Sequence, residues 1–382
     1  MDNRKWEQRG SIRPASMERG GKESMKIGML TSGGDCQGLN SALRGVAKTL
    51  YNELGSTVTI YGIRDGYRGL IEADYRQMNP QDFSDILTLG GTILGTSRQP
   101  FKEMRKITED SEETKLEKML RTVDHEGFDC LVILGGNGTH KTAHLLNQHG
   151  VNVVTLPKTI DNDLWGTETT FGFQSAINIA STVIDSIHST AFSHSRVFIV
   201  EVMGHKAGWL TLYAGIASGA DIIVIPEIPY SAEKIAQAIE KRERNGKRFS
   251  ILAVAEGAIS QEEAAMSKKA FKAAREQMPY PSISYRIADE LKALTGQEIR
   301  VTIPGHYQRG GAPCPADRLL TTRFGVAAAQ LIRQKKFGYM VALQSNHIVP
   351  VPLSEVAGKL KTVPPDGEIV RAARALGLSM GD

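Results

Sequence analysis

The fold is decided by residues 129–163, which read DCLVILGGNGTHKTAHLLNQHGVNVVTLPKTIDND. The apolar run 130–134 has the length and composition of a strand that is buried on both faces. A glycine-rich loop follows at 135–139, and the apolar spacing after it predicts a helix. A second apolar run, 151–156, stops at the polar segment 157–163. The pattern predicts a strand–loop–helix–strand unit whose polar groups follow the carboxyl ends of both strands, where open α/β sheets bind ligands.

The two polar segments of this unit suit phosphate chemistry. Glycines let the backbone come close to a ligand, and the first turn of the following helix offers free N–H groups to an anion. Two carboxylates, Asp161 and Asp163, stand beside Lys158, a set that suits a hydroxyl substrate and a metal-bound phosphate. Each segment alone is common, either in α/β proteins or in loops capped by Asx turns. Together, one strand apart, they favour a phosphate-handling site.

The composition argues against several classes of protein. A chain of 382 residues exceeds what one hydrophobic core supports, which predicts two domains. The formal net charge of +4 is small and no basic run alternates with aromatics, so nucleic acid is not an expected partner. Cys36, Cys130 and Cys314 form no CxxC pair, which argues against a zinc site or a disulfide framework. Because no apolar run approaches the ~20 residues of a membrane span and no signal peptide is recognisable, we expect a cytoplasmic protein without a membrane partner.

Strands alternate with helices along the rest of the chain. A second strand with a glycine-rich end covers 25–35, and a third glycine-rich segment covers 90–98. Residues 102–124 are charged and helical in pattern, whereas the tail after residue 344 is weakly patterned. The alternation predicts an α/β fold with parallel sheets covered by helices. Residues 1–24 are charged and lack periodicity, which predicts a disordered extension.

Five motifs of this sequence resemble those of the phosphofructokinase family, in its bacterial branch with ATP-dependent and pyrophosphate-dependent members. They stand in the family's order at 33–40, 135–139, 157–163, 201–204 and 305–311. One such motif alone is unspecific, whereas five in order are highly specific. The resemblance implies the fold of that family, which consists of two Rossmann-like domains with parallel-type sheets covered by helices.

The resemblance also implies how the chain divides and what it does. A larger domain, residues 25–172 plus 308–359, is expected to bind the phosphate donor. A smaller domain, residues 173–307 plus 360–382, is expected to bind fructose 6-phosphate. The implied reaction is the glycolytic transfer of the γ-phosphate of ATP, with Mg²⁺, to the 1-hydroxyl of fructose 6-phosphate, in a homo-oligomer.

Roles of individual residues follow from the same resemblance. Asp161 is the expected base for the sugar hydroxyl, and the other expected catalytic residues are Arg98, Thr159 and Asp163. The expected donor site consists of Gly34, Arg98, Gln99, Gly136, Asn137, Gly138, Thr139 and Lys158. The expected sugar-phosphate site consists of Thr159, Asp161, Arg196, Met203, Gly204, His205, Glu256, Arg300, His306 and Arg309. Mg²⁺ is expected on Asn137 and Asp163, and Arg196 and Arg300 are expected to serve a neighbouring subunit.

Three departures from the family's pattern concern the metal, the sugar and the effectors. Asn137 stands where the family usually has a magnesium-binding aspartate, and an amide is a weaker ligand for a hard cation. His205 stands at the position of a usual arginine. The loop at 77–80 lacks an arginine of the effector site, so allosteric control of the usual kind is not expected.

The choice of donor depends on two positions that point in different directions. Pyrophosphate-dependent relatives carry aspartate at the position of Gly138, where its bulk and charge obstruct the nucleotide α-phosphate; glycine therefore favours ATP. Lys158 is typical of pyrophosphate users, although some ATP users have it. We expect an ATP-dependent kinase of fructose 6-phosphate. A pyrophosphate-dependent enzyme is the alternative, and a catalytically weak regulatory or sugar-phosphate-binding homologue is an alternative of another class.

Overall fold

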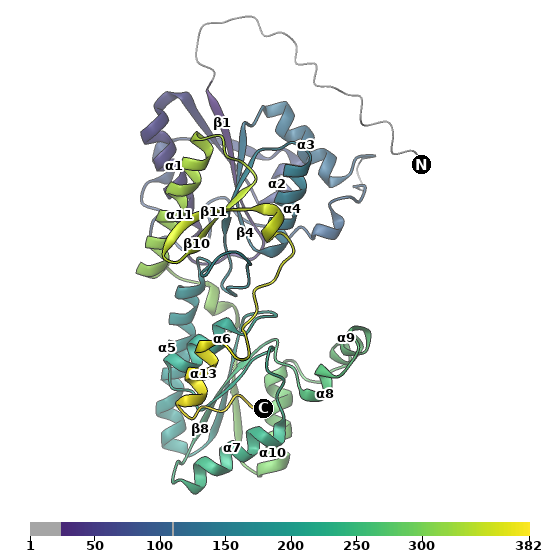
Figure 1. The fold of residues 1–382 in the computed structure, drawn as a ribbon, viewed down its shortest axis with the longest axis vertical. Helices are drawn as coiled ribbons and strands as arrows, with labels where there is room; N and C mark the ends of the chain where they lie inside the picture. The colour runs from purple at the N-terminus through teal and green to yellow at the C-terminus, as the bar shows by residue number, and fades with distance from the viewer. Residues whose placement is uncertain (1–23, 109–110) are drawn as a thin grey trace, which may run out of the picture.

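The computed structural model describes residues 24–108 and 111–382, which form two lobes, each built around one β-sheet (Figure 1). The predicted extension, residues 1–24, lies outside the described residues except for Ser24. Strands and helices alternate along the described chain, so the predicted α/β class is confirmed. Within the described ranges, every helix is too short or too polar to cross a membrane.

The larger lobe contains a seven-stranded sheet with the order β11-β10-β5-β4-β1-β2-β3. Its strands are β1 (Met25–Ser32), β2 (Val58–Ile63), β3 (Tyr75–Met78), β4 (Cys130–Gly135), β5 (Val153–Pro157), β10 (Tyr339–Gln344) and β11 (His347–Pro352). The central strands pair in parallel, but β3 and β11 pair antiparallel at the two edges. The sheet is therefore mainly parallel, as predicted, with an antiparallel strand at each edge. A tight turn at Ser345 and Asn346, both with positive φ, makes the β10–β11 hairpin.

Helices cover both faces of this sheet. They are α1 (Leu39–Leu54), α2 (Tyr67–Glu72), α3 (Lys115–Glu126), α4 (Asn137–Gln148), α11 (Pro315–Arg333) and α12 (Leu353–Val356), with the 3-10 turns η1 (Gly55–Thr57), η2 (Pro80–Phe83) and η3 (Phe101–Glu103). α1 and α11 share a hydrophobic core with one face, and α2, α3, α4 and α12 share a core with the other. Gly45 and Gly325 allow α1 and α11 to touch, because a Cβ on Gly325 would lie 2.7 Å from the backbone of Gly45.

Helix α3 begins later than its sequence pattern predicts. The charged pattern over 102–124 predicts one helix, but the helix starts at Lys115. There the Thr114 hydroxyl accepts a bond from the Glu117 N–H, and the Glu117 carboxylate accepts one from the Thr114 N–H at 2.7 Å. This capping box satisfies free donors of the first turn and fixes the start of the helix.

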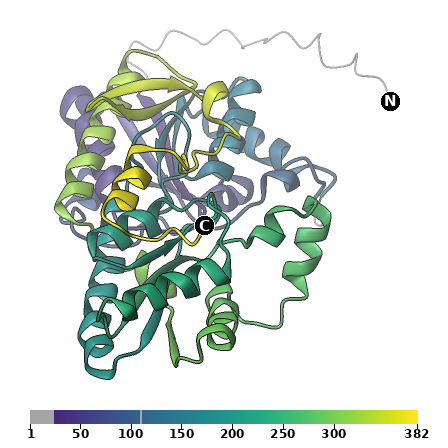
Figure 2. The ribbon, with the colours of Figure 1, turned by 60° about the horizontal axis from the view of Figure 1, so that its bottom comes forward.

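The smaller lobe contains a four-stranded parallel sheet with the order β7-β8-β6-β9. Its strands are β6 (Val197–Val202), β7 (Ile222–Val224), β8 (Ser250–Ala255) and β9 (Ile299–Thr302). Its helices are α5 (Phe173–His194), α6 (Trp209–Ala217), α7 (Ala232–Arg244), α8 (Gln261–Ala264), α9 (Lys268–Glu276), α10 (Ile283–Thr295) and α13 (Glu368–Ala375), with the 3-10 turn η4 (Gly305–Arg309). α5, α6 and α13 cover one face and α7 and α10 the other, while α8 and α9 project sideways (Figures 1 and 2).

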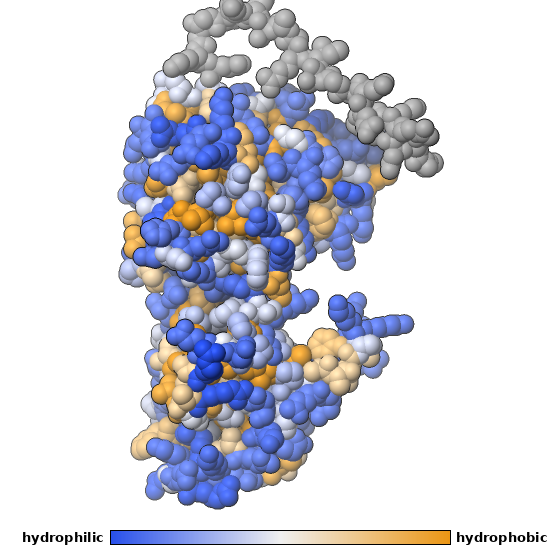
Figure 3. Space-filling view, viewed as in Figure 1, coloured by the Kyte–Doolittle hydropathy of each residue, from blue (hydrophilic) through white to orange (hydrophobic). Residues whose placement is uncertain are grey.

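Strands of both sheets end at the junction of the lobes. β1, β4 and β5 of the larger sheet, and β6 and β8 of the smaller one, each run into residues that line one shared cavity. The surface is hollowed between the lobes in Figure 3. Residues 357–367, here called the crossing segment, pass from α12 in the larger lobe to α13 in the smaller lobe (Figure 1). The carboxyl ends of parallel strands are where α/β sheets bind ligands, so a binding site is expected at this junction.

Candidate active site

The cavity between the lobes has a volume of about 680 Å³ and gathers most of the residues predicted from the sequence. Those that line it are Gly34, Arg98, Gln99, Gly136, Asn137, Gly138, Thr139, Lys158, Thr159, Asp161, Asp163, Met203, His205, Glu256, His306 and Arg309. Ser32, Gly33, Pro100 and Phe101 also line it. These four residues were not predicted for the site, and the signal for them in the sequence is that they adjoin the glycine-rich segments.

The loop after β5 is held in one shape by its own hydrogen bonds. The Thr159 hydroxyl accepts a bond from the Asp161 N–H at 3.1 Å, and the Thr170 hydroxyl donates to the Thr159 carbonyl at 2.7 Å. Asn162 is 3% exposed and has a φ of 51°, a left-handed conformation that asparagine tolerates better than most residues. One carboxylate oxygen of Asp161 is buried and has no hydrogen-bond partner among the described residues. Asp161 itself is one of the residues that line the cavity.

Three cationic side chains surround the loop after β1. The Lys158 ammonium donates to the Gly34 carbonyl, and Arg309 donates to the Asp35 carbonyl at 3.0 Å. A Cβ on Gly34 would lie 3.0 Å from Arg309 Nη1 and 3.5 Å from Arg98 Nη2, so both guanidinium groups lie against this glycine. Burial lowers the pKa of Lys158, which is 4% exposed. So many cations at one loop favour an anionic ligand.

The acidic side of the cavity is built around Asp163. This side chain is 7% exposed, and burial, followed by the charge of Asp161, raises the pKa of Asp163 to about 6. Asn137 lies at the start of α4, and its amide N–H donates to the Lys359 carbonyl at 2.6 Å. Its side-chain oxygen is thereby left available to a ligand. Within residues 24–108 and 111–382, no group of three His, Cys, Asp or Glu side chains is arranged to hold a metal ion alone.

The smaller lobe contributes the turn after β6, which hydrogen bonds to Glu256 stabilise. One Glu256 oxygen accepts bonds from the Gly204 N–H at 3.2 Å and from the His205 N–H at 2.8 Å. The Met203 N–H donates to the Gln308 side chain at 3.3 Å, which ties the same turn to η4. Met203, His205 and Glu256 line the cavity. Gly204 does not line it, but its N–H donates a hydrogen bond to Glu256.

Two predicted residues lie away from the cavity. Arg196 pairs with Glu298 at 2.7 Å, and Arg300 pairs with the same carboxylate. The two arginine side chains are 31% and 54% exposed, respectively. Within one chain they therefore do not contribute to the cavity.

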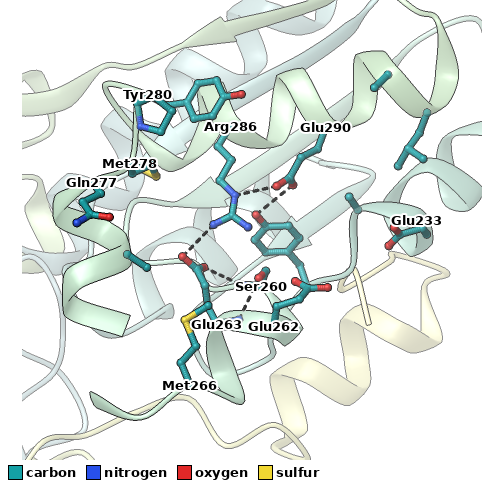
Figure 4. A pocket seen from close by; sticks show the side chains of 16 residues that line it. Glu233, Ser260, Glu262, Glu263, Met266, Gln277, Met278, Tyr280, Arg286 and Glu290 are labelled. Atoms are coloured by element: carbon teal, nitrogen blue, oxygen red, sulfur yellow. Dashed lines mark hydrogen bonds and ion pairs between the residues drawn. The ribbon is translucent and has the colours of Figure 1, made fainter. Parts of the chain in front are cut away.

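A second cavity, of about 570 Å³, lies among α7, α8, α9 and α10 in the smaller lobe (Figure 4). Three of the charged side chains that line it, Glu263, Arg286 and Glu290, belong to one ion-pair network. Glu263 accepts a bond from Arg275 at 2.9 Å and pairs with Arg286 at 2.9 Å, and Arg286 also pairs with Glu290 at 2.7 Å. Such a closed network connects the projecting helices α8 and α9 to the lobe. The cavity between the lobes differs from it, because cationic residues and the carboxylates Asp161 and Asp163 line it together at the ends of strands from both lobes.

Sequence comparison relates the whole chain to known enzymes. The model of the phosphofructokinase family matches residues 26–332. The ATP-dependent 6-phosphofructokinase of Spirochaeta thermophila is 55% identical over 358 residues, which cover 93% of this chain and 97% of that relative. The ATP-dependent 6-phosphofructokinase of Propionibacterium freudenreichii is 45% identical, with 94% of this chain and 100% of that relative covered.

Solved structures agree with this relation. A phosphofructokinase chain from Saccharomyces cerevisiae matches with a TM-score of 0.73 at 30% identity over 87% of this chain, which spans 45% of that chain. A pyrophosphate-dependent phosphofructokinase from Nitrosospira multiformis matches with a TM-score of 0.76 over 94% of this chain and 93% of its own; at 19% identity the likeness shows the fold alone. The motifs, the fold and these relatives together show that the chain belongs to the phosphofructokinase family.

Proposed function

We propose that the cavity transfers the γ-phosphoryl group of ATP to the 1-hydroxyl of fructose 6-phosphate, with Asp161 as the base. Membership of the family and 55% identity to an ATP-dependent 6-phosphofructokinase make this chain an enzyme of that kind. The observation that carries the mechanism is the buried Asp161 oxygen without a partner. Asp161 also lines the cavity, where its carboxylate would accept the proton of a bound hydroxyl.

Asp161 would take the proton of the sugar 1-hydroxyl as that oxygen bonds to the γ-phosphorus. The bond between the γ-phosphorus and the bridging oxygen breaks, and ADP leaves with its electrons. A positioned base of this kind contributes about 10²–10⁴-fold to the rate. Thr159 supports this role, because its hydroxyl accepts the Asp161 N–H and so fixes the start of the loop.

The cations around Gly34 would neutralise the phosphates. Phosphoryl transfer is accelerated mainly by positioning and by positive charge around the transferred group. We assign Lys158 and Arg98 to the transferring phosphate, and His306 and Arg309 to the phosphate of the sugar. Arg309 supports this assignment because its Nε is buried and has no partner among the described residues.

The oxygen ligands offered by Asn137 and Asp163 fit Mg²⁺. Asp163 and the Asn137 oxygen are hard oxygen ligands, and magnesium usually takes one or two carboxylates together with phosphate oxygens and water. These two residues would hold the ion. When bound, Mg²⁺ would supply positive charge to the donor phosphates.

Gly138 supports ATP as the donor over pyrophosphate. It lies in the first turn of α4, and a Cβ built on it would meet no atom within 4 Å. Open space at this point leaves room for the α-phosphate of a nucleotide. Gln99, Gly136 and Thr139 line the same side of the cavity, and we assign them to the donor.

We further propose how the lobes and copies of the chain divide the work. ATP would bind to the larger domain, residues 25–172 plus 308–359. Fructose 6-phosphate would bind to the smaller domain, residues 173–307 plus 360–382. The enzyme would work in the cytoplasm. Arg196 and Arg300 would bind the sugar phosphate of a neighbouring copy in a homo-oligomer. Their position outside the cavity of their own chain, and their partial exposure, support this role.

Initial rates with fructose 6-phosphate test the proposal, with ATP or pyrophosphate as donor and with Asp161→Asn as the control. We expect turnover with ATP, little with pyrophosphate, and a large loss of turnover in the variant. A preference for pyrophosphate would refute the argument from Gly138. Binding of fructose 6-phosphate without turnover on either donor would instead indicate a sugar-phosphate-binding homologue.

A further inference from the structure

The crossing segment places an ammonium group against the catalytic loop. Lys361 Nζ donates to the Asn162 side-chain oxygen at 2.9 Å, to the Thr167 carbonyl at 2.9 Å and to the Glu168 carbonyl at 2.8 Å. Three acceptors satisfy the three donors of a lysine ammonium. Lys361 is not among the residues that line the cavity.

Asn162 connects this ammonium to the two functional carboxylates. It stands between Asp161 and Asp163 in the chain. Its left-handed backbone conformation sets the relative orientation of these two neighbouring residues. Its oxygen also accepts the Thr170 N–H at 3.1 Å, and its amide donates to the Glu168 carbonyl at 3.3 Å. Lys361 thus binds the same oxygen and the same carbonyl that fix the conformation of Asn162.

Lys361 is itself fixed from both lobes. Its N–H donates to the Asp163 carbonyl at 2.8 Å, and Leu360 pairs with Leu164 in an antiparallel bridge. From the smaller lobe, Trp209 Nε1 donates to the Lys361 carbonyl at 3.0 Å. The ammonium lies 5.5 Å from the centre of the Trp209 ring, within the range of a cation–π contact. The side chain therefore has little freedom to move away from Asn162.

We propose that Lys361 is a positioning residue for phosphoryl transfer, which acts through Asn162 to hold Asp161 and Asp163 in their reacting positions. This inference rests on the proposed function. A displacement of reacting groups by about 1 Å can cost about 10²-fold in rate. Because Lys361 does not touch the cavity, its loss should lower turnover more than it weakens substrate binding.

Three variants test the proposal by steady-state kinetics, at a temperature well below the unfolding midpoint of each. Lys361→Met keeps most of the apolar stem and removes the ammonium. Asn162→Gly removes the shared oxygen and still permits a positive φ. The third variant combines both changes. Lys336→Met is the matched control, because this lysine is exposed at the end of α11.

We expect Lys361→Met to lower kcat about 10²-fold, with KM for ATP and for fructose 6-phosphate changed by less than about threefold. The double variant should lose clearly less than the product of the two single losses, because the two residues share one contact. Lys336→Met should behave like the natural chain. If Lys361→Met does not fold, Lys361→Arg is measured instead. It should lose about tenfold in kcat, because a planar guanidinium cannot replace the three diverging donors.

Losses that simply multiply in the double variant would overturn the inference, as would unchanged kcat or a loss that falls mainly on KM. If the natural chain has no activity with either ATP or pyrophosphate, the result would contradict the proposed function instead. The two failures are therefore distinguishable in one set of measurements.

Discussion

Replacing Asp163 by asparagine should stabilise the folded protein while it removes activity. The side chain is 7% exposed, and burial followed by the charge of Asp161 raises the pKa of Asp163 from 3.8 to about 6. At about 1.36 kcal/mol per unit, this shift corresponds to about 3 kcal/mol of free energy against the ionised, folded form. Asparagine has nearly the same shape and carries no charge. It should remove this cost, in which the attraction of Lys361, which lowers the pKa of Asp163, is already included.

The dependence on pH gives this prediction its signature. Because the pKa of Asp163 is higher in the folded than in the unfolded chain, the folded state binds more protons between pH 3.8 and about 6. The contribution of Asp163 to stability therefore falls as the pH rises through this window. Below the window the carboxyl is protonated in both states, and the two proteins should differ little. Above it, the variant should be more stable by up to about 3 kcal/mol.

The assay is thermal unfolding of both proteins in EDTA without nucleotide, at pH 5 and at pH 8. Midpoints are compared instead of free energies, because a chain with two lobes need not unfold in one step. We expect the midpoint of Asp163→Asn to exceed that of the natural chain by more at pH 8 than at pH 5. Kinase activity should be strongly reduced at the same time. A variant that is equally stable or less stable at pH 8 would refute the reasoning, since the carboxylate would then carry no such cost.

Three further substitutions test the other roles. Asp161→Asn should lower kcat about 10²-fold or more with little change in KM, because it removes only the proton acceptor; near-natural turnover would exclude Asp161 as the base. Gly138→Asp should depress rates with ATP far more than with pyrophosphate, because the new carboxylate would occupy the open space that we assign to the α-phosphate of ATP. Equal losses with the two donors would contradict this assignment. Asn137→Asp should lower the magnesium concentration needed for half-maximal rate, although it loses the bond to the Lys359 carbonyl; an unchanged titration would remove position 137 from the metal site.

Most of the cavity could be predicted because its residues stand in short motifs at the ends of strands. The segments 135–139 and 157–163 follow β4 and β5 directly, and parallel neighbouring strands bring their carboxyl ends to one edge. Local spacing is enough for such a prediction. The antiparallel β11 was missed for the opposite reason, since its register comes from pairing with β10 and not from a pattern in the tail.

Local pattern and family motifs fixed the α/β class, the family and the residues at the strand ends, because strand burial, glycine-rich loops and capping act over a few neighbouring positions. The three-dimensional structure alone decided which distant groups meet. Lys361 and Asn162 are 199 positions apart, yet their side chains form a hydrogen bond. Arg196 and Arg300 carry the same charge as Arg309, yet they lie at the amino ends of the parallel strands β6 and β9, opposite the strand ends that meet the cavity. Such contacts depend on how two lobes and a crossing segment come together, and no local spacing in the chain encodes that.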